Sequence, residues 1–157
     1  MTEKDKLYLS EAIEIARRNI ENGGGPFGSV VVKGDMKISS SGNRVVPDND
    51  PTAHAEVSAI RKASSELGTF DLSDCTIYAS CEPCPMCLGA IYWAGIRRVV
   101  YASDRFSAAA AGFSDEMIYR EINLSNDRKS IVMDQGLSAE GEKVFEAWDR
   151  FDGKVRY

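Results

Sequence analysis

The sequence predicts an α/β fold, with a mixed sheet that is covered by helices on both faces. Apolar runs of strand length alternate with segments whose apolar residues recur at helical spacing, and this alternation is typical of a sheet packed between helices. The chain has 157 residues, of which 43% are hydrophobic and 27% charged. This length suffices for one domain with a hydrophobic core. We therefore expect a single domain over residues 1–157.

An amphipathic helix and a β-hairpin are expected first. Four apolar residues recur at helical spacing within residues 4–21: Leu9, Ile13, Ala16 and Ile20. The GGGP stretch at residues 23–26 ends that pattern. Two β-rich runs within residues 29–43 then flank the Lys33-Gly34-Asp35 turn signal, which predicts a hairpin.

Helices and strands alternate through the rest of the chain. A second helix is expected to begin at Asp50 as its cap, with Pro51 in the first turn, and to end at Gly68. Residues 104–114 are left unassigned. The remaining expected elements are strand 75–80, helix 83–95, strand 97–103, helix 114–122, strand 130–136 and helix 142–151.

Charge and composition disfavour several classes of function. No apolar run reaches the roughly 18 residues that cross a bilayer, so no membrane role is expected. The N-terminal MTEKDKLYLS is charged and lacks the apolar core of a secretory signal, which predicts a cytoplasmic location. The net charge of −5 would repel a phosphate backbone, so nucleic acid is not the expected partner.

The cysteines and the histidine form two motifs. Three of the four cysteines lie in SCEPCPMCLGAIYWAG at residues 80–95, and the single histidine, His54, lies in TAHAE. Glu56 completes H-x-E, while Cys84 and Cys87 form P-C-x-x-C, and this pair of motifs is the signature of zinc deaminases. Each motif lies near the start of an expected helix, where the helix dipole favours thiolates. The motifs predict one Zn²⁺ per subunit, held by His54, Cys84 and Cys87.

A closed structural zinc site is the alternative interpretation. Cys81 could join the other three residues as a fourth ligand, since Cys₃His is a common structural set. That arrangement leaves Glu56 without a task, whereas three ligands leave an open position for a water beside Glu56. We therefore favour the catalytic site, with Cys81 as a neighbour and Cys75 as a buried core thiol.

Longer stretches resemble a known family. NDPTAHAEVSAIRKA and SCEPCPMCLGAIYWA are similar to the cytidine deaminase-like zinc hydrolases, and among these to the bacterial guanine deaminases. The similarity extends through GGPFGSVVVK, AGFSDEMIY and the C-terminal tyrosine. It implies a three-layer fold with a five-stranded mixed sheet, and hydrolytic deamination of guanine to xanthine and ammonia. An alanine run at residues 108–111 departs from the family pattern and leaves the shape of the pocket beside Asp115 open.

The resemblance also implies individual roles. Glu56 would act as a general acid/base, and Asp115 would contact the amino group of the substrate. The residues expected to bind the substrate are Phe27, Asn43, Ala55, Cys84 through its backbone N–H, Trp93 and Tyr157. Structural alternatives stay open: core packing for Phe27 and Trp93, a turn for Asn43, a helix start for Asp115 and a frayed terminus for Tyr157.

Oligomeric state and rival functions complete the expectations. Members of the family are commonly dimers, and the resemblance implies a homodimer that exchanges its C-terminal segment, about residues 140–157, so that Tyr157 closes over the site. Isocytosine or guanosine are alternative small-molecule substrates. A tRNA adenosine deaminase would need a basic face that Arg97-Arg98 alone does not supply. The non-enzymatic alternative is a zinc-stabilised binding module.

Overall fold

A computed structural model describes all residues, 1–157, and divides the chain into two compact units, Met1–Asp115 and Glu116–Tyr157. The first unit contains α1 (Glu3–Glu21), β1 (Gly28–Lys33), β2 (Met36–Gly42), α2 (Val45–Asp48), α3 (Ala55–Leu67), β3 (Cys75–Cys81), α4 (Pro85–Trp93), β4 (Arg98–Ser103) and α5 (Arg105–Ala110). The second unit contains α6 (Glu116–Glu121), the 3₁₀ helix η1 (Asn126–Arg128) and α7 (Ser138–Arg150). None of the helices combines the length and the apolar character that a membrane crossing needs.

The sheet of the first unit is mixed, as predicted. Its strand order is β2-β1-β3-β4, with β1 antiparallel to both β2 and β3, and β3 parallel to β4. The hairpin between β1 and β2 turns at Gly34, whose φ of +56° lies in the left-handed region that glycine adopts without strain. Parallel strands need a crossover, and α4 provides it between β3 and β4.

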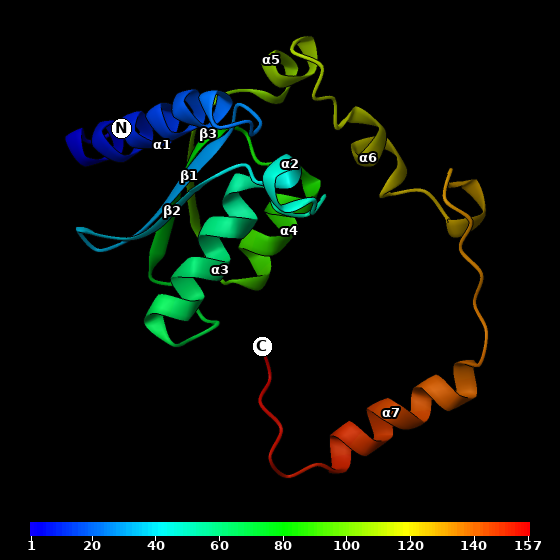
Figure 1. Ribbon diagram of the computed structural model, residues 1–157. Helices are drawn as coiled ribbons and strands as arrows, with labels where there is room; N and C mark the ends of the chain where they lie inside the picture. The colour runs from blue at the N-terminus through cyan, green and yellow to red at the C-terminus, as the bar shows by residue number, and fades with distance from the viewer. The chain divides into compact units, whose positions relative to one another are not determined.

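Helices cover both faces of this sheet (Figure 1), as the alternation of elements predicted. Helix α1 lies on one face, and α3 and α4 lie on the other. Successive side chains of β1 point to opposite faces, so the strand contributes to two apolar clusters. On the α1 side the buried residues are Leu9, Ala12, Val30, Val32 and Tyr78. On the other side they are Val31, Ala59, Ile60, Ala63, Leu72, Cys75, Ile77, Ile91, Ala94 and Ile96.

The sheet has four strands, and the prediction of a fifth strand at residues 130–136 is wrong. The apolar run there favours a strand by composition alone. A strand also needs a neighbouring strand to take its backbone N–H and C=O groups, and this segment pairs with none. The exposed fractions of Ile131 (69%) and Val132 (84%) agree with an unpaired segment.

The boundary of the second expected helix differs from the structure. The helix α3 begins at Ala55, with His54 as its N-cap, rather than at Asp50. The carboxylate of Asp50 instead accepts hydrogen bonds from the backbone N–H (2.8 Å) and the hydroxyl (2.7 Å) of Thr52, which stabilises a separate turn. His54 therefore lies at the tip of a helix rather than inside its first turns. The helices α2 and α5 were not expected from the sequence.

The second unit contains the two helices expected near the C-terminus. Helix α6 agrees with the expected range, and α7 begins earlier than expected, at Ser138. The Glu121 carboxylate accepts hydrogen bonds from the backbone N–H (3.0 Å) and the hydroxyl (2.8 Å) of Ser130, which joins the end of α6 to the segment after η1. At the end of α7, the rings of Trp148 and the C-cap residue Phe151 are 6.3 Å apart.

Asp5 joins the start of α1 to the sheet. Its carboxylate accepts two hydrogen bonds from the guanidinium of Arg98, at 2.7 and 2.8 Å, and one from the hydroxyl of Tyr78, at 2.9 Å. It also accepts from the backbone N–H of Thr2, which forms a capping box at the helix start. The Arg98 guanidinium and the Thr2 N–H hold the pKa of Asp5 well below its ordinary range.

We expect Asp5→Asn to lower the melting temperature at pH 7 by several degrees, because a neutral amide cannot accept the paired bonds of Arg98. A carboxyl group whose pKa is depressed by folding stabilises the protein above its unfolded pKa, about 3.9, and loses that effect as pH falls. The difference between variant and parent should therefore shrink in melting curves recorded below about pH 4. Asp35→Asn, at an exposed pair with Lys4, is the matched control and should be nearly silent.

Candidate metal centre and active site

The N-termini of two helices supply the candidate ligands. His54 is the N-cap of α3 and Cys84 is the N-cap of α4, and both have extended backbone conformations. Neither side chain makes a hydrogen bond that caps its own helix. Pro85 follows Cys84 at the first helical position, where the missing N–H costs nothing. Both side chains are therefore available to bind a ligand.

The structure brings His54, Cys84 and Cys87 together. The Nδ1 atom of His54 lies 3.5 Å from the Sγ atom of Cys84 and 3.4 Å from that of Cys87. All three ligand atoms lie within 4.8 Å of one another. Tetrahedral zinc, with bonds of about 2.0–2.1 Å to nitrogen and about 2.3 Å to sulfur, separates N and S ligands by about 3.6 Å. The donor set and its spacing therefore fit Zn²⁺.

One thiol of this group is readily ionised. A hydrogen bond from Cys87 lowers the pKa of Cys84 to about 4, and His54 acts in the same direction. The same bond to Cys84, together with burial, raises the pKa of Cys87, so the Cys87 thiol keeps its proton while Cys84 carries the charge. Hydrogen bonding to Cys84 also raises the pKa of His54. Zinc ligands must be deprotonated, so a metal ion would displace the protons that these groups share.

Glu56 lies beside the three ligands without belonging to them. It is in the first turn of α3, and only 7% of it is exposed. The Sγ of Cys87 donates to its Oε2 at 3.5 Å. Burial raises the pKa of Glu56, and the Cys84 thiolate adds to this effect. A buried carboxyl group next to a metal-binding set has the placement that a general acid/base requires.

Cys81 and Cys75 lie outside the group of ligands. The thiol of Cys81 donates to the backbone oxygen of Asp104 at 3.5 Å, and burial raises its pKa to about 11. Cys75 is buried in the apolar core beneath α3 and α4, where burial raises its pKa to about 11. All four cysteines are free thiols. The geometry therefore corresponds to three ligands with a carboxylate beside them, rather than to a closed set of four.

Comparisons with known proteins assign the family. Residues 2–103 match the cytidine and deoxycytidylate deaminase zinc-binding region, and this range contains all three candidate ligands. The chain belongs to the cytidine and deoxycytidylate deaminase family. As a deaminase of this family, it is 48% identical to the guanine deaminase of Bacillus subtilis over 153 residues, which cover 97% of this chain and 98% of the relative.

Solved structures agree with this assignment. The crystal structure of guanine deaminase from Bacillus subtilis matches with a TM-score of 0.95 and 46% identity, over 100% of this chain and 99% of that chain. A related deaminase variant in complex with 8-azaguanine matches with a TM-score of 0.68 and 36% identity, over 71% of this chain and 64% of that chain. The cytidine deaminase-like fold predicted from the sequence is thus confirmed.

Asn43 and Phe27 occupy a half-enclosed region of the first unit. Asn43 is 7% exposed, and its Oδ1 accepts the backbone N–H of Val45 at 3.2 Å. Its Nδ2 donates to no acceptor within the chain. Every fully buried side-chain nitrogen or oxygen atom has a hydrogen-bond partner, so Nδ2 must be accessible to solvent. The ring of Phe27 meets the ring of Phe113 edge-on, with centroids 5.0 Å apart. Asn43 thus stabilises a turn while its Nδ2 donor stays accessible. Sequence reasoning missed Phe113.

Asp115 is a half-buried carboxyl group in the electrostatic field of the ligand set. Burial raises its pKa, the Cys84 thiolate acts in the same direction, and the Arg105 guanidinium opposes them. Among the candidate ligands, Cys84 is the one whose charge acts on Asp115. Arg105, at the start of α5, is a second neighbour that sequence reasoning missed, because that helix was not expected.

The other expected substrate-binding residues lie in different settings. Ala55 is fully buried as the first residue of α3. Trp93 is 71% exposed and lies at the opposite end of α4 from Cys84. Tyr157 belongs to the second unit and is 80% exposed. The substrate-binding roles of these three residues remain predictions.

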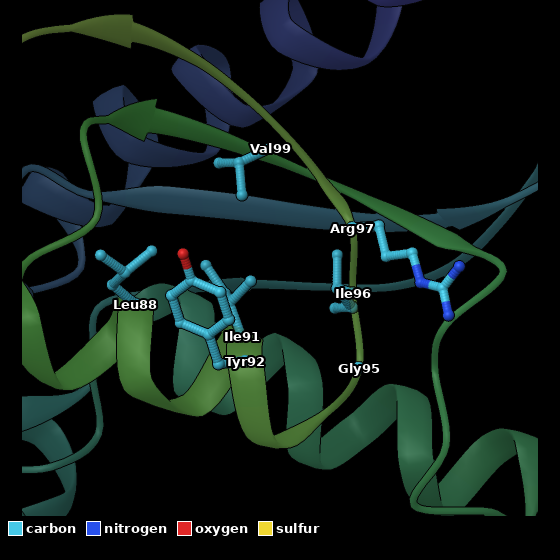
Figure 2. Close-up of a pocket in the computed structure, with 7 residues that line it drawn as sticks. All are labelled: Leu88, Ile91, Tyr92, Gly95, Ile96, Arg97 and Val99. Carbon is cyan, nitrogen blue, oxygen red and sulfur yellow. The ribbon is translucent and has the colours of Figure 1, made fainter.

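A pocket of about 470 Å³ lies between α4 and the start of β4 (Figure 2). Side chains of α4 line it on one side, and the turn after α4 with the start of β4 lines it on the other: Leu88, Ile91, Tyr92, Gly95, Ile96, Arg97 and Val99. None of the candidate ligands lines this pocket, and its lining contains no carboxylate. The acid–base chemistry therefore belongs to the Glu56 site and not to this pocket.

We expect zinc to be lost from Cys84→Ala and from Cys87→Ala, because each removes one of only three protein ligands. Cys81→Ala should retain about one zinc per subunit, since its thiol bonds a backbone oxygen instead. Elemental analysis of the purified variants measures this directly. Zinc loss in Cys81→Ala together with full retention in Cys84→Ala would contradict the ligand assignment.

Proposed function

We propose that the protein is a zinc-dependent aminohydrolase that converts guanine and water to xanthine and ammonia. The observation that carries this proposal is the buried Glu56 carboxyl group beside His54, Cys84 and Cys87. The identity of 48% to a guanine deaminase over 97% of the chain supports guanine as the substrate. The 8-azaguanine complex of a related deaminase supports a purine-shaped pocket.

Glu56 would carry the proton transfers. When bound, zinc supplies a water whose pKa is lowered toward about 7, so that hydroxide is available at neutral pH. Glu56 takes one proton from the attacking water and passes it to the ring nitrogen while the oxygen bonds to the ring carbon. It then passes the second proton of that oxygen to the leaving amino group. The carbon–nitrogen bond then breaks, ammonia leaves, and the ring carbon keeps a carbonyl. Burial of Glu56 raises its pKa, and this suits a group that alternates between accepting and donating a proton.

Four further groups would hold the base in position. The Asn43 Nδ2 donates to an acceptor on the purine edge, and the Phe27 ring packs against the purine face. The Asp115 carboxylate accepts from the amino group that leaves. The backbone N–H of Cys84, at the start of α4, donates to the reacting oxygen, as unpaired N–H groups at helix starts can do. Guanine is neutral, so the net charge of −5 does not oppose its binding.

The assembly and location form part of the same proposal. Residues 1–157 form one catalytic domain, which works as a homodimer that exchanges the segment at about residues 140–157. The large exposed fraction of Tyr92 (75%), beside the apolar pocket of the first unit, supports an interface between subunits. The C-terminal helix likewise exposes Val144 (67%) and Phe145 (73%). Four free cysteines support a reducing cytoplasmic location.

Ammonia release from a panel of substrates tests the proposal. We expect guanine to be converted, with weaker or no release from isocytosine, guanosine, cytosine and adenosine. Adenosine in a tRNA anticodon loop should remain unchanged, because an acidic chain lacks the charge to capture phosphates. Editing of tRNA without ammonia release from free guanine would replace the proposed substrate.

We expect Glu56→Gln to retain zinc while turnover of guanine falls between about 10²- and 10⁴-fold, because glutamine keeps the size but cannot titrate. Zinc content, melting temperature and turnover should be measured on one preparation. Glu66→Gln, at an exposed position of the same helix, is the matched control and should keep the parent turnover. Full zinc with turnover within about threefold of the parent would exclude Glu56 as the general acid/base.

A further inference from the structure

The side chain of Asn19, near the end of α1, joins the segments that carry Phe27 and Asn43. Its Nδ2 donates to the backbone oxygen of Gly25 at 2.8 Å and to the backbone oxygen of Asn43 at 2.7 Å. Its own backbone oxygen accepts the N–H of Gly24 at 2.9 Å. A single residue outside the candidate site therefore holds both segments that would contact the base.

The surroundings of the Asn19 carboxamide are shaped to it. A Cβ atom added at Gly24 would collide with Asn19 Nδ2, and one added at Gly42 would collide with Asn19 Oδ1. Both neighbouring positions are glycine, so the carboxamide is enclosed by backbone on two sides. Its orientation is consequently set by packing as well as by its two hydrogen bonds.

The position of Asn43 follows from these contacts. The Asn43 N–H donates to the backbone oxygen of Phe27 at 3.0 Å, and its Oδ1 accepts from Val45 at 3.2 Å. With the backbone oxygen held by Asn19 as well, the backbone and one side of the carboxamide are fixed. The direction in which the accessible Nδ2 of Asn43 points is therefore fixed as well. The next residue, Arg44, donates its N–H to the oxygen of Ala53 at 2.8 Å, directly before the candidate ligand His54.

We propose that Asn19 is a positioning residue for the base-binding pocket, which acts by fixing the backbone of Gly25 and Asn43 and thereby the direction of the Asn43 Nδ2 donor. The inference rests on the proposed function, in which Asn43 binds the base. Asn19 acts through Asn43, whereas the proton transfers belong to Glu56 on α3. Loss of the Asn19 bonds therefore weakens substrate binding and leaves the chemical step in place.

Two variants of Asn19 test the inference on the zinc-loaded protein. Asn19→Ala removes the carboxamide, and Asn19→Asp keeps its size but turns a carboxylate toward two backbone oxygens. We expect each variant to raise KM for guanine about tenfold, because the free energy of about one hydrogen bond corresponds to a tenfold change in affinity. The kcat should stay within about threefold of the parent. The matched control is Asn22→Ala, which should keep the parent KM, because the side chain of Asn22 at the same helix end donates only to the Arg18 oxygen, at 3.0 Å.

A double variant separates positioning from a merely structural role. If Asn19 acts through Asn43, Asn19→Ala should raise KM no further in an Asn43→Ala background. The Kd for 8-azaguanine, measured in the Glu56→Gln background where turnover is suppressed, should rise by the same factor as KM. Multiplied losses in the double variant would overturn the inference, as would loss of zinc and kcat together in Asn19→Asp.

The activity of the parent protein shows whether the role of Asn19 alone is wrong or the proposed function as well. A parent that converts guanine, with Asn19 variants of unchanged KM, overturns the role of Asn19 and leaves the proposed function standing. A parent that neither converts guanine nor binds 8-azaguanine overturns the proposed function and the inference with it. If Asn19→Ala does not fold, Asn19→Asp decides the outcome, because it preserves the volume between Gly24 and Gly42.

Discussion

The candidate site depends on the convergence of two helix N-termini, those of α3 and α4. Each helix is held against the same face of the sheet by a shared apolar cluster, to which Ala59 of α3, Ile91 of α4 and Ile77 of β3 belong. The two N-cap residues, His54 and Cys84, have extended backbones, and their side chains meet between the two helix ends. A zinc–sulfur bond is about 2.3 Å long. A shift of either helix by a fraction of that length would therefore move its ligand atom out of reach of a shared zinc ion.

A cluster of titratable groups is the electrostatic consequence of this convergence. Cys87 bonds both Cys84 and Glu56, and a charge on more than one of these three groups would be costly without a counter-charge. A bound divalent cation supplies that counter-charge and lets the thiols ionise. The same site that can hold a cation therefore also places the Glu56 carboxyl group beside it.

Helix α1 supports the site from the opposite face of the sheet. At its start, Asp5 is bonded to Tyr78 of β3 and to Arg98 of β4, so the helix is fixed to the two parallel strands that flank α4. Near its end, Asn19 holds the backbone of Gly25 and Asn43. One helix thus connects the strands behind the metal ligands with the loop expected to bind the base.

The sequence by itself determined which residues could bind zinc, because H-x-E and P-C-x-x-C are local patterns whose spacing is set along one chain segment each. It also predicted α1, the hairpin, β3, α4 and β4 from periodicity and turn residues. Only the tertiary structure decided that residues 130–136 form no strand, since pairing depends on a distant neighbour rather than on local propensity. It likewise decided the start of α3 at His54, and it brought Phe113 to Phe27 and Asn19 to Asn43. Those contacts join residues far apart in the chain, and packing against the sheet creates them.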